Sequence, residues 1–263
     1  MHLRDKVVVV TGGANGIGKA LCERFAAEGA RMVAVADLEA DNAATVADAI
    51  GGIAFGVNVR DEQQITDMVQ TIERDHGPVD LFCSNAGIIA TDGEPWWAVS
   101  APNETWQAMW EIHVMSHVYA ARACLPSMLE CGEGYFLNTV SAAGLLNQIG
   151  DAAYSTTKHA AVGFAEALAI THGDDGIGVS MICPQAVATR MIGSVEGGGS
   201  AGVDGVLSPA QVADAVIEGL AEGRFMILPH PEVETYRQNK ASDYGRWIGG
   251  MRKLRRSFAH PQL

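Results

Sequence analysis

Residues 7–18 read VVVVTGGANGIG. The four valines predict a strand that is buried on both faces, as strands of parallel sheets are. Apolar residues then recur at helical spacing at Ile17, Leu21 and Phe25, so a helix follows. The glycines between strand and helix would let the backbone approach a phosphate group at the helix N-terminus. A tight turn without a ligand would carry the same glycines, so this stretch alone is weak evidence for a nucleotide site.

The same alternation of strand and helix continues along the chain. Such alternation predicts a parallel sheet with helices on both faces, because each helix carries the chain back across the sheet. We expect a single α/β domain over residues 1–263, a Rossmann-type doubly wound sheet of about seven strands. The expected strands are 7–10, 31–36, 53–57, 79–83, 135–140, 179–183 and 225–228; the expected helices after the first are 39–50, 61–75, 105–129 with a break near Pro126, 154–172 and 210–221.

Two segments differ from this alternating pattern. Residues 190–207 contain many glycines between Gly193 and Gly205, which predicts a mobile loop over a substrate site. Residues 231–263 form a C-terminal extension in which Arg246, Arg252 and neighbouring cations surround apolar side chains at near-helical spacing. We expect this amphipathic segment to dock on the protein body or on a partner subunit; attachment to a membrane surface is the alternative.

Composition excludes several classes of function. The formal net charge is −13, which repels the phosphate backbone of nucleic acids, so no nucleic-acid partner is expected. Five cysteines without a C-x-x-C pair indicate neither a disulfide framework nor a metal site. The N-terminal residues lack the layout of a signal peptide, and no run of 18 apolar residues occurs. We therefore expect a cytoplasmic protein without membrane insertion.

Asp37 follows the second expected strand, about 20 residues after the glycines. At this place a carboxylate accepts hydrogen bonds from both hydroxyls of an adenosine ribose and repels a 2′-phosphate. Ala14, Asn15 and Leu38 offer no cation that would offset the repulsion. The spacing thus predicts NAD rather than NADP as the cofactor.

Several motifs together resemble the short-chain dehydrogenase/reductase family. Their joint order and spacing are far more specific than any one of them, including the thirteen residues from Ser141 to Tyr154. The motifs span residues 11–189, and the last 30 residues add no family signal. They are Thr11–Gly18, Asn85-Ala86-Gly87, Ser141, Tyr154-x-x-x-Lys158 and Pro184-x-x-Val187-x-Thr189.

The resemblance implies hydride transfer between a nicotinamide and a secondary alcohol or ketone. Tyr154 would exchange a proton with the alcohol oxygen, Ser141 would hydrogen-bond that oxygen, and Lys158 would also contact the nicotinamide ribose. His113 stands where the family has a helix asparagine and is the fourth expected catalytic residue. The implied cofactor-binding residues are Gly12, Asn15, Gly16, Ile17, Gly18, Asp37, Asn58, Val59, Asn85, Ala86, Gly87, Tyr154, Lys158, Pro184, Val187 and Thr189.

The effect of Lys158 on Tyr154 can also be argued from helix geometry and charge, without the family resemblance. Four residues apart on a helix, they share one face. At about 5 Å and an effective dielectric constant near 20, the ammonium favours the phenolate by roughly 3 kcal/mol. We therefore expect the pKa of Tyr154 to fall from about 10 to about 8. Taken alone, a tyrosine and a lysine at this spacing are usually an ordinary surface pair.

Three residues depart from the family pattern: His113, Gln185 where glycine usually follows the proline, and His117 where glycine is common. The family asparagine lies in a distorted helix turn, and we expect His113 to support that turn as a neutral ring; simple packing is the alternative. These departures motivate a second hypothesis, a catalytically silent NAD-binding sensor or scaffold protein, although such a protein would not need Ser141, Tyr154 and Lys158.

The sequence also indicates a class of substrate and an assembly. Trp96, Trp97, Met191 and Ile192 favour a medium-sized apolar substrate, cyclic or steroid-like, with a sugar or an acyl-thioester ketone as alternatives. The alanine-rich helices 105–129 and 154–172 permit close approach of two copies, and related dehydrogenases associate through them. We expect a homodimer or homotetramer.

Overall fold

The computed structural model describes residues 1–94, 96–193 and 196–257. In this part of the chain it has one seven-stranded parallel sheet in the order β3-β2-β1-β4-β5-β6-β7, which confirms the expected fold class. The strands are β1 (Val7–Thr11), β2 (Met32–Asp37), β3 (Ile53–Gly56), β4 (Leu81–Ser84), β5 (Gly134–Thr139), β6 (Ile177–Ile182) and β7 (Met226–Ile227).

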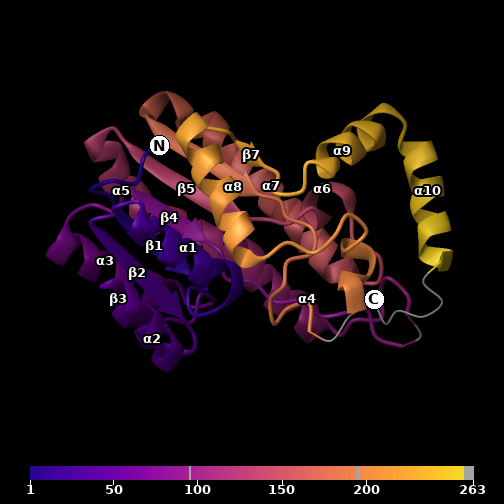
Figure 1. Cartoon of the computed structure of the whole chain (residues 1–263), viewed down its shortest axis with the longest axis horizontal. Coiled ribbons are helices and arrows are strands. Elements are labelled where there is room, and N and C mark those ends of the chain that lie inside the picture. Colours follow the sequence, from indigo (N-terminus) through magenta and orange to yellow (C-terminus); the bar gives the residue numbers. More distant parts are fainter. Residues whose placement is uncertain (95, 194–195, 258–263) are drawn as a thin grey trace.

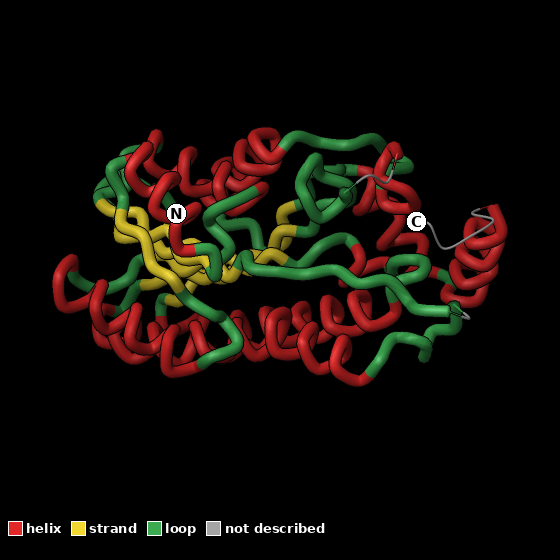
Figure 2. The backbone as a smooth tube through the Cα atoms, turned by 90° about the horizontal axis from the view of Figure 1, so that it is seen from below, coloured by secondary structure: helices red, strands yellow, loops and turns green. Residues whose placement is uncertain are grey.

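Helices cover both faces of the sheet, as Figure 2 shows. The face covered by α1, α2 and α8 receives Val8 and Val10, and the face covered by α3, α5 and α7 receives Val7 and Val9. This alternation explains why β1 is apolar throughout. The helices are α1 (Gly16–Ala27), α2 (Ala40–Ile50), α3 (Glu62–His76), α4 (Asn103–Trp110), α5 (Ser116–Cys131), α6 (Ala143–Leu146), α7 (Ala152–His172), α8 (Pro209–Glu222), α9 (Glu232–Ser242) and α10 (Tyr244–Ser257).

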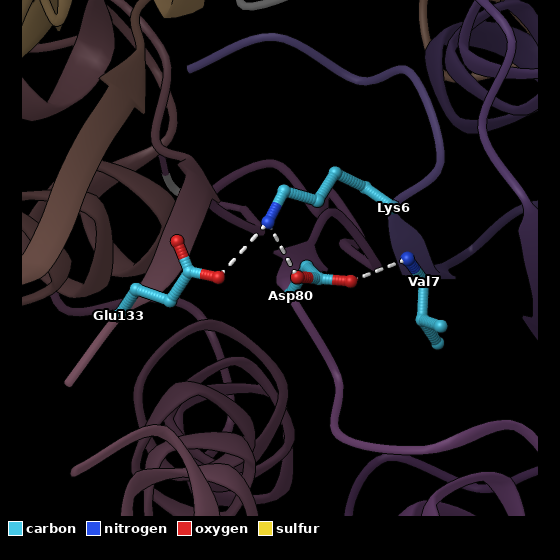
Figure 3. A network of polar contacts seen from close by, with 4 residues as sticks. All are labelled: Lys6, Val7, Asp80 and Glu133. Carbon is cyan, nitrogen blue, oxygen red and sulfur yellow. Dashed lines mark hydrogen bonds and ion pairs between the residues drawn. The ribbon is translucent and has the colours of Figure 1, made fainter. Parts of the chain in front are cut away.

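The strand order reverses at β1, which has β2 on one side and β4 on the other. Ligands of such sheets bind beyond the carboxyl ends of the strands at the point of reversal. A charged network joins the amino-terminal ends of the central strands (Figure 3). The Lys6 ammonium contacts Asp80 at 2.8 Å and Glu133 at 3.2 Å, and Asp80 also accepts the Val7 N–H at 2.7 Å. The contact with Asp80 raises the pKa of Lys6. This network aligns the starts of β1, β4 and β5.

The expected break near Pro126 is wrong. Helix α5 continues through Pro126. Pro126 and Arg122 are exposed, so solvent can hydrogen-bond the Arg122 carbonyl that proline leaves without a donor. The irregularity lies earlier, at a π-helical turn of residues Glu111–Met115 between α4 and α5.

The C-terminal extension contains two helices rather than one. Helix α9 packs against α6: Val233 is buried with Ala142 and Leu146, and the Lys240 ammonium donates to the Leu145 carbonyl at 2.6 Å. Half-buried Trp247 of α10 packs against the same cluster, and the rest of α10 projects beyond α9 at the right of Figure 1. Within residues 190–207 the structure has a short 3-10 helix, Glu196–Ala201, and a strand-like bridge between Val187 and Leu207. Among the described residues, no helix is both long and apolar enough to cross a bilayer.

Candidate active site

The glycine-rich turn joins β1 to α1 at the carboxyl edge of the sheet. Gly12 has φ +65°, and a Cβ there would lie 2.9 Å from the Ala86 Cα atom. A Cβ on Gly18 would lie 2.0 Å from the Gly12 carbonyl oxygen. The turn therefore admits no side chains at these two positions, and its bare backbone carries the first N–H groups of α1 toward the sheet edge.

A cavity of about 760 Å³ opens beside this turn. Its volume lies in the usual range for small-molecule and cofactor sites. Asn15, Gly16 and Thr189, all expected to bind the cofactor, line it together with Lys19 and Ile192. The residues present thus fit a dinucleotide whose phosphates face the N-terminus of α1.

Asp37 ends β2 next to the turn. One carboxylate oxygen accepts the Ala14 N–H and the other accepts the Glu39 N–H, each at 3.0 Å. These bonds fix the carboxylate at the edge of the cofactor site. Asn58 and Val59, which the resemblance lists among the cofactor residues, follow β3 at the same edge of the sheet.

Asn85 ties the segment after β4 to both neighbouring strands. Its backbone N–H donates to the Thr11 hydroxyl and its side-chain amide donates to the Thr11 carbonyl, both at 3.0 Å. The Thr139 hydroxyl donates to the Asn85 side-chain oxygen at 3.0 Å. The expected cofactor residues Ala86 and Gly87 are held in place as a result.

Ser141 lies directly beyond β5 in a strained conformation, with φ +115°. Its hydroxyl donates to the Pro184 carbonyl at 3.4 Å and accepts the Ala143 N–H at 3.1 Å. Pro184, Val187 and Thr189 follow β6, the neighbouring strand. The structure therefore brings the motifs after β5 and β6 together.

Tyr154 lies in the first turn of α7 and Lys158 in the next, both buried. The ammonium of Lys158 lies 5.6 Å from the centroid of the Tyr154 ring and donates to the Thr139 carbonyl at 2.8 Å. The pair therefore shares one helix face, as expected.

The expected fall in the pKa of Tyr154 is wrong for the protein without cofactor. Burial raises the pKa of Tyr154 to about 12, the hydrogen bond with Ser141 opposes the rise, and the charge of Asp151 adds to it. Burial also lowers the pKa of Lys158 to about 7. A charged ammonium alone would lower the pKa of Tyr154, but burial is the larger effect on both groups.

His113 lies in the π-helical turn and is fully buried. Its Nε2 accepts the Ile88 N–H at 3.1 Å, so in the neutral ring Nδ1 carries the proton and donates to the Thr157 hydroxyl at 2.9 Å. Burial, then the charges of Lys158 and His117, hold the pKa of His113 well below its usual value. A neutral ring was expected.

His113 also contacts the catalytic helix. Its ring meets the Tyr154 ring edge to face, with the centroids 5.4 Å apart. Thr157, which accepts from His113, donates to the Ala153 and Tyr154 carbonyls. His113 therefore joins the π-helical turn, the segment after β4 and the first turns of α7.

His117 lies one turn further along and is buried. Neither of its ring nitrogens has a hydrogen-bond partner among the described residues. Burial, then the charge of Lys158, lowers the pKa of His117 to about 3. A neutral ring is therefore maintained beside Lys158.

Sequence reasoning missed two buried carboxyl groups at the start of α7. Asp92, from the segment after β4, accepts the Ala152 N–H at 3.0 Å. Burial, then the charge of Asp92, raises the pKa of Asp151 to about 7. Asp151 could have been found as an N-cap residue three positions before Tyr154, but no local signal marked Asp92.

The expected apolar substrate residues are scattered. Trp97 is exposed, Trp96 is half-buried with φ +64°, and Met191 is exposed. Only Ile192 of the four lines the large cavity described above.

Comparison with known proteins agrees with this geometry. A family model described as short chain dehydrogenase matches residues 6–197. The chain belongs to the short-chain dehydrogenase family. Family members use nicotinamide cofactors on small-molecule substrates, and the curated relatives are named dehydrogenases and reductases, so this family member is an oxidoreductase.

Two relatives and one solved structure illustrate the similarity. The chain is 32% identical to the 1-deoxy-11-beta-hydroxypentalenate dehydrogenase of Streptomyces exfoliatus, over 94% of this chain and 91% of that protein. It is 30% identical to the meso-2,3-butanediol dehydrogenase of Serratia marcescens, over 73% and 75%. A short-chain dehydrogenase/reductase from Burkholderia phymatum, solved in complex with NAD, superposes with a TM-score of 0.82 at 26% identity, covering 93% of this chain and 95% of that one.

Proposed function

We propose that the chain is an NAD-dependent alcohol dehydrogenase that interconverts a secondary alcohol and a ketone. The observation that carries the proposal is the meeting of Ser141, Tyr154 and Lys158: the Ser141 hydroxyl is hydrogen-bonded to the Tyr154 phenol, and the Lys158 ammonium lies 5.6 Å from the centroid of the Tyr154 ring. A protein that only binds a dinucleotide needs the turn but has no use for a hydroxyl and a phenol next to it.

The preference for NAD rests on Asp37. Two backbone N–H groups hold its carboxylate in place, so it cannot easily swing away from a ligand. A fixed anion at the end of β2 suits the two ribose hydroxyls of NAD and repels the 2′-phosphate of NADP. Arg190, a cation that lines the cavity, is already paired with the Glu39 carboxylate at 3.5 Å.

Side chains of the protein carry out the proton transfer to and from the substrate oxygen. When bound, a nicotinamide supplies the hydride exchange and, in its oxidised form, a positive charge. Tyr154 is protonated at neutral pH because burial raises its pKa, so in ketone reduction it is ready to donate. Ser141 would hold the reacting oxygen near the phenol, and a protonated Lys158 would stabilise the phenolate that remains.

Two features bear on the substrate. The relative from Streptomyces exfoliatus is named for a hydroxylated compound, and its similarity covers nearly the whole of both chains. Ile192 and the adjoining loop add apolar surface beside the cavity. We therefore propose a medium-sized, largely apolar secondary alcohol, cyclic or steroid-like.

The assembly that we propose is a homodimer or homotetramer in the cytoplasm. Leu129 of α5 and Ile170 of α7 are exposed apolar side chains on the two helices expected to pair. Their burial against a second copy would remove apolar surface from water.

The test is a substrate screen. Purified protein is first titrated with NADH and NADPH to measure both affinities, and a panel of cyclic secondary alcohols is then offered with NAD at the nicotinamide absorbance. We expect tight NADH binding and turnover of cyclic alcohols. Tight NADH binding with no turnover of any compound would instead favour the sensor.

A further inference from the structure

An ion pair joins two segments on either side of the cofactor site. Arg190 follows Thr189 and lines the cavity, and its guanidinium lies 3.5 Å from Oε2 of Glu39, which follows β2. In the sheet, β1 lies between β2 and β6, so the pair spans the carboxyl end of β1, where the glycine-rich turn begins. Arg190 lies beyond the last family motif, so the resemblance assigns it no role.

The same oxygen of Glu39 also accepts a hydrogen bond from the Asn15 side chain of the turn, at 3.4 Å. Asn15 is the N-cap residue of α1, and its side chain makes no cap hydrogen bond to that helix. The first N–H groups of α1 are therefore left for another acceptor. A diphosphate at this helix N-terminus would meet both these N–H groups and the guanidinium of Arg190.

The ion pair can open at little cost. The side chains are 73% exposed for Arg190 and 51% exposed for Glu39, and exposed pairs contribute little to stability. Glu39 keeps hydrogen bonds from Asn15 and Asn42 when Arg190 leaves. A diphosphate offers two negative charges and oxygens that fit the planar fork of a guanidinium. The diphosphate is therefore the stronger partner for Arg190.

The other cation that lines the cavity is Lys19 of α1. Its ammonium lies 3.8 Å from the Glu23 carboxylate, one turn further along the same helix. This pairing directs Lys19 away from the glycine-rich turn, whereas the pairing with Glu39 holds Arg190 beside it. Among the residues lining the cavity, Arg190 is therefore the cation best placed for a diphosphate.

We propose that Arg190 binds the diphosphate of the dinucleotide cofactor, and that Glu39 holds Arg190 only in the free protein. The proposal rests on the proposed NAD-dependent activity and adds a residue to its cofactor site. The backbone just before Arg190 is already anchored, because the Ala188 N–H donates to the Leu207 carbonyl at 2.8 Å. The exchange of partners therefore takes place mainly in the Arg190 side chain.

The test measures binding by calorimetry, without turnover, for two ligands: ADP-ribose, which contains the diphosphate, and adenosine, which has no phosphate. Arg190→Met should weaken ADP-ribose binding by about tenfold, or about 1.4 kcal/mol, and leave adenosine binding unchanged. Arg74→Met is the matched control, because Arg74 is 67% exposed and pairs with the Asp75 carboxylate at 2.8 Å. The control should bind both ligands as the unmodified protein does.

A second variant separates an exchange of partners from a fixed ion pair. Glu39→Gln removes the competing charge but keeps an oxygen for Asn15 and Asn42. It should tighten ADP-ribose binding by about two- to threefold, because Arg190 no longer has to leave an anion. In the Arg190→Met background the same substitution should have little effect, since no guanidinium remains to be released. A pair that only held the segment in place would make both single variants weaken binding.

Four results would each overturn the proposal and leave the proposed activity standing. They are an unchanged ADP-ribose affinity in Arg190→Met, an equal loss of adenosine binding in that variant, no tighter ADP-ribose binding in Glu39→Gln, and an equal gain from Glu39→Gln in both backgrounds. If the unmodified protein bound ADP-ribose no more tightly than adenosine, the proposed NAD-dependent activity would fail together with this role of Arg190.

Discussion

Replacing His113 with alanine tests whether this residue positions the catalytic helix. The substitution removes two buried hydrogen bonds, to the Ile88 N–H and to the Thr157 hydroxyl, and the edge contact with Tyr154. Asparagine at the same place keeps one donor and one acceptor on a shorter side chain. We therefore expect His113→Asn to keep most of the activity and His113→Ala to lose it.

The expected size follows from these contacts. Two neutral hydrogen bonds are worth about 1–3 kcal/mol together, so the alanine variant should unfold at a temperature lower by roughly 5 °C. Turnover should fall by about tenfold, or 1.4 kcal/mol of transition-state stabilisation, because Thr157 no longer holds the carbonyls of the first turn of α7. The affinity for NADH should change little, since the hydrogen bonds that fix Asp37 and Asn85, two expected cofactor residues, do not involve His113.

The assay measures kcat, KM and the dissociation constant for NADH between about pH 6 and pH 10, with thermal unfolding as the control for folding. A purely structural role would lower stability but leave kcat and its pH profile unchanged. An alanine variant with unaltered turnover across this pH range would show that His113 has no part in positioning the proton-transfer group.

Four further predictions follow from the site. Asp37→Ala should narrow the gap between NAD and NADP affinity by removing a fixed anion; equal binding of both cofactors by the unmodified protein would contradict the reasoning. Tyr154→Phe should abolish turnover and keep NADH binding, so more than a few per cent of residual turnover would point to another acid. Burial raises the pKa of Asp151 from an ordinary 3.8 to about 7, so between these two values the folded chain keeps a proton that the unfolded chain releases, and the free energy of unfolding falls as pH rises. Asp151→Asn lacks this group, so in urea unfolding its stability relative to the unmodified protein should increase between about pH 5 and pH 8. A difference that stays constant with pH would refute the raised pKa. Sedimentation at micromolar concentration should show a dimer or tetramer, and a monomer would rule out pairing through α5 and α7.

The sheet could be predicted closely because its signals are local. Each strand of β1 to β6 is a short apolar run beside a turn, and β1 alternates its valines between two cores. Pro126 was misread because the rule that proline breaks helices assumes that the freed carbonyl is not satisfied by solvent. The π-helical turn had no sequence signal beyond the family resemblance, since Glu111–Met115 continues an ordinary helical pattern.

The candidate site was predicted where motifs carry it and missed where tertiary contacts make it. The roles of Ser141, Tyr154 and Lys158 were implied by the family motifs, but the burial that raises the pKa of Tyr154 comes from elements far apart in the chain. Glu39 and Arg190 meet only because both follow strands at the carboxyl edge of one sheet, so no local pattern could pair them.

The position of β1 in the middle of the sheet has a consequence for synthesis of the chain. Its neighbour β4 leaves the ribosome roughly 70 residues later, about 4–15 s at ordinary elongation rates, whereas β2 follows much sooner. During that interval one edge of a four-valine strand is open to other nascent chains. The arrival of Asp80, which binds both Lys6 and the Val7 N–H, closes the edge. Translation speed in this stretch therefore sets how long this edge of β1 stays unpaired.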